Sequence, residues 1–270
     1  MEIFDRDGTA LAYRQLGTGP VAVFVHGFPL DSTMWLEQLE LLRDRRRCVA
    51  VDLRGFGSSD AVAEPVLAME QHAEDVAALS DHLGAERIDL VGLSMGGYVA
   101  LAFAELFPQR LRTLALIDTR AAADSEGTRA GRDMMAVRVT VQGRGPLAVE
   151  MTEALLGPTA SLHIKARMRT MVEGTRVETI VAALEGMKQR PARFDVLSRL
   201  SIPVGVVVGE DDTATPVSEA EEMVDAALAA TLTIVEAAGH MTPMENPTAV
   251  ADALARLWAQ AGHEGSPSDG

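Results

Sequence analysis

The sequence contains almost no cysteine. Cys48 is the single cysteine among 270 residues, so the chain cannot form an intrachain disulfide. A secreted scaffold held together by disulfides is therefore excluded. Cys48 opens an apolar, strand-like run, and this position predicts a buried, unreactive thiol rather than a nucleophile.

Positive charge and long apolar runs are also scarce. The chain has 24 Lys and Arg against 39 Asp and Glu, a formal net charge of -15. Such a surface repels the phosphates of nucleic acids and anionic membranes, so neither is expected as a partner. No run approaches the ~18 consecutive apolar residues of a membrane span. The first residues, MEIFDRDGTA, show no basic-then-apolar signal peptide, and we expect a cytoplasmic protein.

Sequence signatures of metal and nucleotide sites are missing as well. There is no HExxH or CxxC, and no G-x-G-x-x-G opens a first strand-helix unit. The glycine-rich segment GFGSSD (55–60) lacks the lysine of a phosphate-binding loop. We therefore expect neither a metal nor a cofactor.

Strand-like and helix-like segments alternate along most of the chain. An N-terminal hairpin is expected around Gly8. Apolar runs that predict strands lie at 21–25, 49–53, 88–92, 114–118, 203–209 and 231–237. Helical patterns lie at 31–43, 69–83, 95–107, after Pro216 and at 247–260. Because these strands are apolar on both faces, the pattern predicts an α/β fold whose mostly parallel sheet has helices on both sides.

The alternation stops between residues 120 and 200. This block shows amphipathic helical patterns separated by glycines and prolines, and no convincing strand. We expect a helical cap at 120–200, inserted in an α/β core formed by residues 1–119 and 201–261. Residues 262–270 predict a disordered tail.

The segment IDLVGLSMGGYV (88–99) places Ser94 between an apolar strand and a helix. In a nucleophile elbow the serine occupies a strained turn, and the adjacent positions have no room for a β-carbon. Gly92, Gly96 and Gly97 meet that requirement. The alternative is a glycine-rich turn with an incidental serine, but the strand-to-helix context favours a nucleophile.

A serine nucleophile needs a base, an acid that orients the base, and donors for an oxyanion. His240, after the last expected strand, is the candidate base. Asp212 is the preferred acid, with Asp211 and Asp118 as alternatives, although Asp118 also fits a turn-capping role. The order Ser94, Asp212, His240 is the order found in α/β-hydrolases.

The backbone N-H groups of Phe28 and Met95 are the candidate oxyanion donors, because Phe28 follows the first core strand and Met95 follows the nucleophile. The other histidines are expected to have non-catalytic roles. His26 fits a structural role, bonding within its own loop. Polar surface positions are expected for His72, His82, His163 and His263.

Five motifs together resemble the α/β-hydrolase superfamily across residues 9 to 260. They are HGFPLD (26–31), DLRGFGSSD (52–60), GLSMGG (92–97), GEDDTATP (209–216) and AGHMTPMENP (238–247). In that family the GxxDxxxP pattern places the acid at its fourth position, here Asp212. The resemblance implies an eight-stranded sheet with one antiparallel strand and a helical cap between the sixth and seventh strands. It is closest in style to capped carboxylesterases and 3-oxoadipate enol-lactonase-like enzymes, and cofactor-free perhydrolases share nearly all the motifs.

Substrate choice is expected to depend on the cap. Met134, Met135, Met151 and Met241 predict an adaptable apolar pocket for a small ester or lactone. Cap arginines offer the alternative of a carboxylate-bearing lactone: Arg129, Arg132, Arg138, Arg167 and Arg169. Ester or lactone hydrolysis is the leading interpretation. Perhydrolysis or carbon-carbon bond hydrolysis on the same residues, and a non-catalytic small-molecule receptor, remain as alternatives, and the sequence leaves the oligomeric state open.

Overall fold

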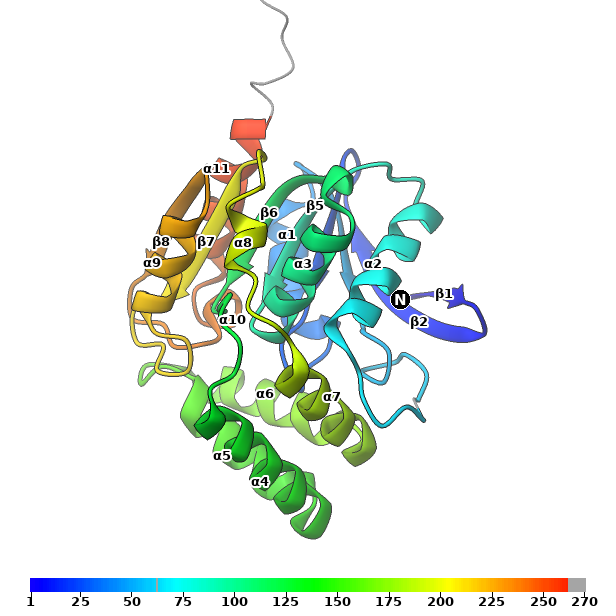
Figure 1. Ribbon diagram of the computed structural model, residues 1–270, viewed down its shortest axis with the longest axis vertical. Helices are drawn as coiled ribbons and strands as arrows, with labels where there is room; N and C mark the ends of the chain where they lie inside the picture. The colour runs from blue at the N-terminus through cyan, green and yellow to red at the C-terminus, as the bar shows by residue number, and fades with distance from the viewer. Residues whose placement is uncertain (62, 262–270) are drawn as a thin grey trace, which may run out of the picture.

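The fold is a single twisted sheet covered by helices, seen in a computed structural model that describes residues 1–61 and 63–261 (Figure 1). The expected tail, 262–270, lies outside the described residues. The strands are β1 (Glu2–Arg6), β2 (Thr9–Leu16), β3 (Val21–Val25), β4 (Arg47–Val51), β5 (Ile88–Leu93), β6 (Leu111–Ile117), β7 (Val204–Gly209) and β8 (Ala230–Val235). Their order across the sheet is β1-β2-β4-β3-β5-β6-β7-β8.

One strand runs against the rest of the sheet. Strand β2 pairs antiparallel with both β1 and β4, and every other neighbouring pair is parallel. Strands β3, β5 and β7 are buried along their whole length, as their unbroken apolar sequences predict. The α/β fold class expected from the sequence is therefore confirmed.

Helices lie on both faces of the sheet. They are η1 (Ser32–Trp35), α1 (Leu36–Leu42), α2 (Met69–His82), α3 (Met95–Leu106), η2 (Pro108–Arg110), α4 (Glu126–Gln142), α5 (Arg144–Leu155), α6 (Leu162–Gly174), α7 (Val177–Gln189), α8 (Phe194–Leu197), α9 (Val217–Ala226), α10 (Thr242–Glu245) and α11 (Pro247–Ala261). Helices α2 and α3 pack together on one face, and α1 and α11 pack together on the other. The predicted helix at 31–43 is divided, since the Asp31 side chain caps a short 3-10 turn before α1 begins.

Helix α11 shows how the sequence pattern places these helices. Val250, Leu254, Leu257 and Trp258 recur at helical spacing and are buried. Burial of each such side chain contributes roughly 1.5 to 3 kcal/mol before entropic costs. The charged residues of α11 lie outside this apolar stripe, so the helix packs against the core with the stripe and leaves its charged side exposed.

Helix α2 contradicts one expectation, because His72 is fully buried and not a surface residue. His72 lies three residues after Met69 and four before Val76, on the stripe that faces the core. Its ring is 6.4 Å from the ring of Phe56, and neither of its ring nitrogens has a hydrogen-bond partner among the described residues. Helical position therefore outweighed the polarity of the side chain. His82 and His163 are exposed, as expected.

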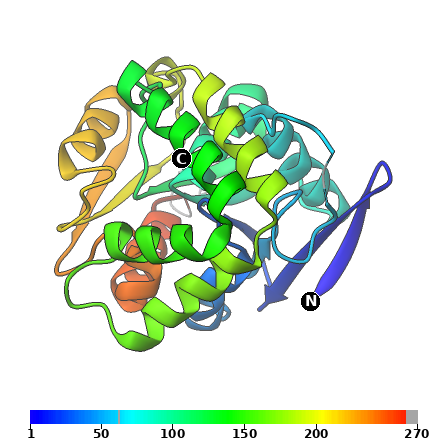
Figure 2. The same cartoon turned by 90° about the horizontal axis from the view of Figure 1, so that it is seen from below.

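Helices α4 to α7 form one group between β6 and β7, which we call the helical insertion (residues 126–189). Figure 2 shows these helices crossing the lower end of the molecule, where the parallel strands end. Contacts with the core hold the insertion: Thr175 Oγ1 donates to Pro29 O at 2.8 Å, and Thr179 Oγ1 donates to Gly55 O at 3.0 Å. The insertion is thereby attached to the loops after β3 and β4. The exact limits expected for a separate cap, 120–200, remain a prediction.

Helices long and apolar enough to cross a membrane do not occur within residues 1–61 and 63–261.

Candidate active site

Ser94 occupies the single residue between the end of β5 and the start of α3. Its backbone angles, φ 53° and ψ -114°, are strained for a residue with a β-carbon. Two hydrogen bonds hold the turn: Ser94 N donates to Ile117 O at 2.9 Å, and Thr119 Oγ1 donates to Ser94 O at 2.7 Å. The neighbouring strand β6 and its loop therefore fix the serine at the carboxyl edge of the sheet.

The glycines around Ser94 are required by close backbone approaches. A β-carbon on Gly92 would lie 2.2 Å from Gly96 O, and one on Gly96 would lie 2.2 Å from Val25 O. A β-carbon on Gly97 would lie 2.4 Å from Thr119 Oγ1. The expectation that no side chain fits at these three positions is confirmed, because α3 starts directly against β3 and β5.

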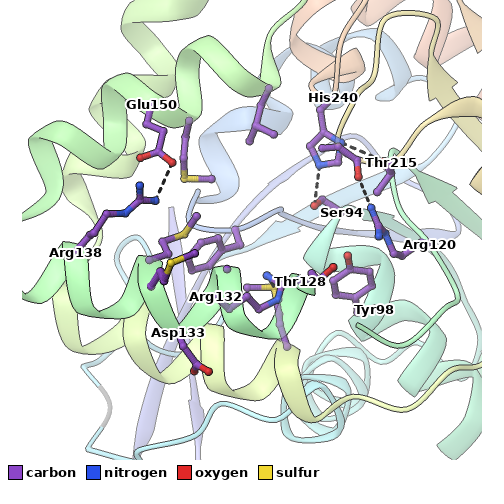
Figure 3. Close-up of a pocket in the computed structure, with 18 of the residues that line it drawn as sticks. Ser94, Tyr98, Arg120, Thr128, Arg132, Asp133, Arg138, Glu150, Thr215 and His240 are labelled. Atoms are coloured by element: carbon purple, nitrogen blue, oxygen red, sulfur yellow. Dashed lines mark hydrogen bonds and ion pairs between the residues drawn. The ribbon is translucent and has the colours of Figure 1, made fainter. Parts of the chain in front are cut away.

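Two hydrogen bonds join Ser94, His240 and Asp212 into one relay. Ser94 Oγ is 2.9 Å from His240 Nε2, a contact that Figure 3 shows. On the other side of the ring, His240 Nδ1 is 2.8 Å from Asp212 Oδ2. Since a carboxylate only accepts, Nδ1 carries the proton and Nε2 is free to accept from the serine hydroxyl. The backbone N-H of His240 donates to Leu155 O at 2.7 Å, so the helical insertion also holds this loop.

Asp212 is held by four donors. Its Oδ1 accepts from Ala214 N and Thr215 N at 2.8 and 2.9 Å, and its Oδ2 accepts from Thr215 Oγ1 at 2.6 Å as well as from His240. Burial alone would raise the pKa of Asp212, but the hydrogen bond and the charge of His240 outweigh it and lower the pKa. The carboxylate is therefore ionised at neutral pH.

The pKa of His240 moves in the opposite direction. Burial alone would lower it, but the hydrogen bond to Asp212 and the negative charge of that carboxylate raise it above the ordinary histidine value. His240 is thus a stronger base than a free imidazole and can take a proton from a hydroxyl that touches it.

The other two acidic candidates do not contact His240. The Asp211 side chain is exposed, and its backbone N-H donates to Ala238 O. Asp118 is fully buried and accepts hydrogen bonds from Gly209 N and from Thr242. Among these three carboxylates, Asp212 alone hydrogen-bonds the imidazole.

Phe28 and Met95 flank the serine, as their sequence positions indicate. Phe28 lines the cavity that contains Ser94, and Met95 is the first residue of α3. A helix's first N-H groups have no carbonyl one turn earlier to bond to, so the Met95 amide can serve an external acceptor. His26 has the predicted structural role: its Nδ1 is 2.9 Å from Gly27 O, and Leu53 N donates to its Nε2 at 3.1 Å.

A cavity of about 800 Å³ opens above Ser94 and His240. Most of its wall comes from the helical insertion. The apolar lining includes Phe28, Met134, Met135, Val137, Met151, Leu155 and Met187, and the polar lining includes Tyr98, Arg120, Thr128, Arg132, Asp133, Arg138, Glu150 and Thr215. The thioethers and branched side chains make this an apolar, adaptable space.

Three of the four methionines expected at the pocket line this cavity. Met134, Met135 and Met151 line it, whereas Met241 is buried in the core and does not. Met241 lies beside His240 in the chain, but its side chain belongs to the hydrophobic core. Tyr98 was missed, although it lies in the first turn of α3, four residues after Ser94, and lines the same cavity.

Each arginine on the cavity wall already faces a carboxylate. Arg132 Nε is 2.5 Å from Asp124, and Arg138 Nη2 is 2.9 Å from Glu150. Of the other arginines considered from sequence, Arg167 pairs with Glu37, and Arg129 and Arg169 are exposed away from the lining.

Arg120 was also missed by the sequence reasoning. It follows β6, lies on the cavity wall near His240, and its Nε is 2.7 Å from Glu219. The described residues contain no group of three or more His, Cys, Asp or Glu side chains arranged to hold a metal ion.

Residues 22–253 match the model of the alpha/beta hydrolase family. The chain belongs to this family. The superfamily resemblance found in the five motifs is confirmed by this match, by the eight-stranded sheet and by similar solved structures. The coarse functional class, a hydrolase of the alpha/beta type, follows from the same findings.

Relatives of this alpha/beta hydrolase include proteins of different function. The chain is 27% identical over 245 residues to 3-oxoadipate enol-lactonase 2 of Acinetobacter baylyi, and the match covers 89% of this chain and 90% of that protein. It is 32% identical over 248 residues to the dihydrolipoyllysine-residue acetyltransferase component of the acetoin cleaving system of Pseudomonas putida. That match covers 88% of this chain but only 64% of the relative.

Two solved structures share the fold over nearly the whole chain. A thermophilic esterase from Thermogutta terrifontis is 39% identical with a TM-score of 0.90, covering 96% of this chain and 97% of that one. The enol-lactonase from Burkholderia xenovorans LB400 is 25% identical with a TM-score of 0.87, covering 96% and 100%. The chain is thus similar to ester-cleaving and lactone-cleaving members of the family.

Proposed function

We propose that this protein is a serine hydrolase that cleaves carboxylic ester or lactone bonds through an acyl-enzyme on Ser94. The observation that carries the proposal is the hydrogen-bonded relay from Asp212 through His240 to Ser94 Oγ, at 2.8 and 2.9 Å, opening into the cavity. The similarity to an esterase and to enol-lactonases supports the same chemistry.

In the first half of the reaction His240 Nε2 takes the proton of Ser94, and Oγ attacks the substrate carbonyl. Asp212 stabilises the imidazolium that forms and keeps its Nδ1-H oriented. The N-H groups of Phe28 and Met95 are the proposed donors to the oxyanion. Each such donor contributes roughly 10²- to 10³-fold in kcat.

The first half ends when the tetrahedral intermediate collapses and the imidazolium gives its proton to the leaving alcohol, which leaves the acyl group on Ser94. In the second half His240 takes a proton from a water molecule that attacks the acyl-enzyme. The second tetrahedral intermediate collapses, the imidazolium returns the proton to Ser94 Oγ, and the carboxylic acid dissociates. A lactone follows the same path, except that the leaving hydroxyl stays attached to the acyl group.

The cavity wall supports small, fairly apolar substrates. Methionines of the insertion cover it, and Arg120, Arg132 and Arg138 each face a carboxylate already. A carboxylate on the substrate would have to share a guanidinium group with a carboxylate that already neutralises it, which weakens its attraction. We propose that residues 120–200 act as the cap that selects the substrate, with Met135, Met151 and Met187 in contact with the acyl group.

The test is a panel of p-nitrophenyl esters of increasing chain length alongside simple lactones. Turnover should be lost in Ser94→Ala and in His240→Ala, while His163→Ala, an exposed histidine outside the cavity, should keep wild-type activity. Full activity in Ser94→Ala or His240→Ala would refute the proposal. If peroxide-dependent bromination or cleavage of a vinylogous diketone were the sole activity, the same relay would serve a different reaction.

A further inference from the structure

Asp118 is a buried carboxyl group with no role in the reaction described above. It follows β6, has an exposed fraction of 0%, and takes the strained backbone angle φ 43°. Its Oδ1 accepts from Gly209 N at 2.9 Å, and its Oδ2 accepts from Thr242 N at 3.1 Å and Thr242 Oγ1 at 2.6 Å. Burying a carboxyl group costs free energy, which these three donors offset in part, and the strained backbone adds a further cost.

The partners of Asp118 lie on the two loops that carry the rest of the relay. Gly209 ends β7, three residues before Asp212, and Thr242 comes two residues after His240. The backbone N-H of Asp118 also donates to Val207 O at 2.9 Å. One residue therefore connects the strand next to Ser94, the loop of the acid and the loop of the base.

We propose that Asp118 is a positioning residue that sets the geometry between Asp212 and His240. Asp118 acts through Thr242 and Gly209 and does not touch the substrate. Its kinetic consequence rests on the proposed hydrolase function, whereas its effect on the imidazole can be measured without any substrate.

The groups around His240 set the direction of that effect. Burial and the positive charge of Arg120 lower the pKa of His240, while the hydrogen bond and charge of Asp212 outweigh them and raise it, with a smaller contribution from Asp118 when it is ionised. Burial raises the pKa of Asp118 itself to about 8, so this carboxyl is mostly neutral at pH 7 and acts there through its hydrogen bonds. Misplacing His240 relative to Asp212 weakens the bond that raises the pKa of His240, so Asp118→Asn lowers that pKa.

Asp118→Asn is the main variant, because its amide replaces an acceptor by a donor that faces the donors of Thr242. Thr242→Val removes one hydrogen bond and leaves the carboxylate, and Thr242→Ser restores the hydroxyl. The control is Asp89→Asn, a fully buried carboxylate near the amino end of β5, away from the site, that accepts from Thr113 Oγ1 at 2.8 Å and pairs with Arg46 and Arg112.

The measurements are the titration of the His240 ring nitrogens by ¹⁵N NMR and the steady-state kinetics of p-nitrophenyl acetate hydrolysis, both on the full chain. We expect a lower pKa of His240 in Asp118→Asn and a kcat reduced roughly ten- to hundredfold with little change in KM, since small misplacements are amplified in the barrier. Thr242→Val should lose less kcat, Thr242→Ser should recover it, and Asp89→Asn should change neither readout.

An unchanged His240 titration in Asp118→Asn, or an equal loss of kcat in Asp89→Asn, would overturn this role. If Asp118→Asn does not fold, Thr242→Val decides: a kcat equal to that of wild type would overturn the proposal. Failure of the wild-type protein to hydrolyse any ester or lactone would refute the proposed function instead, and the NMR comparison would still decide the role of Asp118.

Discussion

Replacing Asp212 by asparagine is the sharpest perturbation of the relay. The Asn oxygen can keep the backbone hydrogen bonds of Ala214 and Thr215, so the loop stays in place. The amide NH₂ then occupies the position of Oδ2 and donates to His240 Nδ1, which forces the ring proton onto Nε2. In that tautomer the imidazole cannot accept the proton of Ser94.

The expected loss is large because the base is in the wrong form although every residue is in its place. A relay of this kind loses roughly 10⁴-fold in kcat when its acid becomes an amide, which corresponds to about 5.4 kcal/mol of activation free energy. The thermal midpoint should fall much less than in core variants, since the buried carboxylate is exchanged for a side chain of the same shape that keeps its backbone hydrogen bonds.

The assay is steady-state hydrolysis of p-nitrophenyl acetate at pH 8, with Asp211→Asn as the control because its exposed side chain does not contact His240. Asp211→Asn should retain wild-type kcat. Activity of Asp212→Asn within tenfold of wild type would refute the reasoning. A 10⁴-fold loss in Asp118→Asn combined with an active Asp212→Asn would assign the acid role to Asp118.

Three further predictions concern the elbow, the base and the core. Gly96→Ala should destabilise the protein by roughly 3 kcal/mol or prevent folding, because its β-carbon would lie 2.2 Å from Val25 O. The control Gly145→Ala in α5 meets nothing within 4 Å and should be neutral or slightly stabilising, so equal urea midpoints for the two variants would contradict this prediction. Because the pKa of His240 is raised and the base must be neutral, kcat/KM should fall with decreasing pH at a midpoint above about 6.5, and a midpoint below that value would count against the relay. Burial lowers the pKa of His72 to about 3 in the folded state. As the pH falls, the unfolded chain therefore takes up a proton on His72 before the folded protein does. The contribution of the neutral ring to stability is complete above about pH 6.5 and is lost as the pH falls towards 3. Between pH 7 and pH 4.5 the free energy of unfolding, measured in urea, should fall about 2 to 3 kcal/mol further for wild type than for His72→Leu. An equal fall in the two proteins would exclude this explanation.

The sheet and the order of the relay could be predicted because they depend on local patterns. Strands such as VAVFV (21–25) are apolar on both faces, which only a sheet covered on both sides can accommodate. The spacing of Gly92, Ser94, Gly96 and Gly97 was informative for a related reason, since a close backbone approach leaves no choice of residue. These features are determined within a few residues of the chain.

The cavity lining could not be predicted in the same way, because it depends on how helices of the insertion pack on one another. Met187 lines the cavity and Met241 does not, although both are methionines and Met241 is adjacent to His240 in the chain. His72 shows the converse error, where a polar residue type suggested exposure and its helical position enforced burial. Sequence preferred Asp212 over the adjacent Asp211 by the family pattern alone, because the direction of each side chain, exposed for Asp211 and buried for Asp212, is set by the fold.

The central claim, that Ser94 is a nucleophile activated by His240 and Asp212, is tested most directly by labelling with a fluorophosphonate and locating the adduct by peptide mass spectrometry. We predict one adduct, on Ser94, formed in parallel with the loss of ester hydrolysis, and a labelling rate that falls sharply in His240→Ala. Absence of an adduct on Ser94 while ester hydrolysis continues, or equal labelling of Ser94→Ala, would contradict the account.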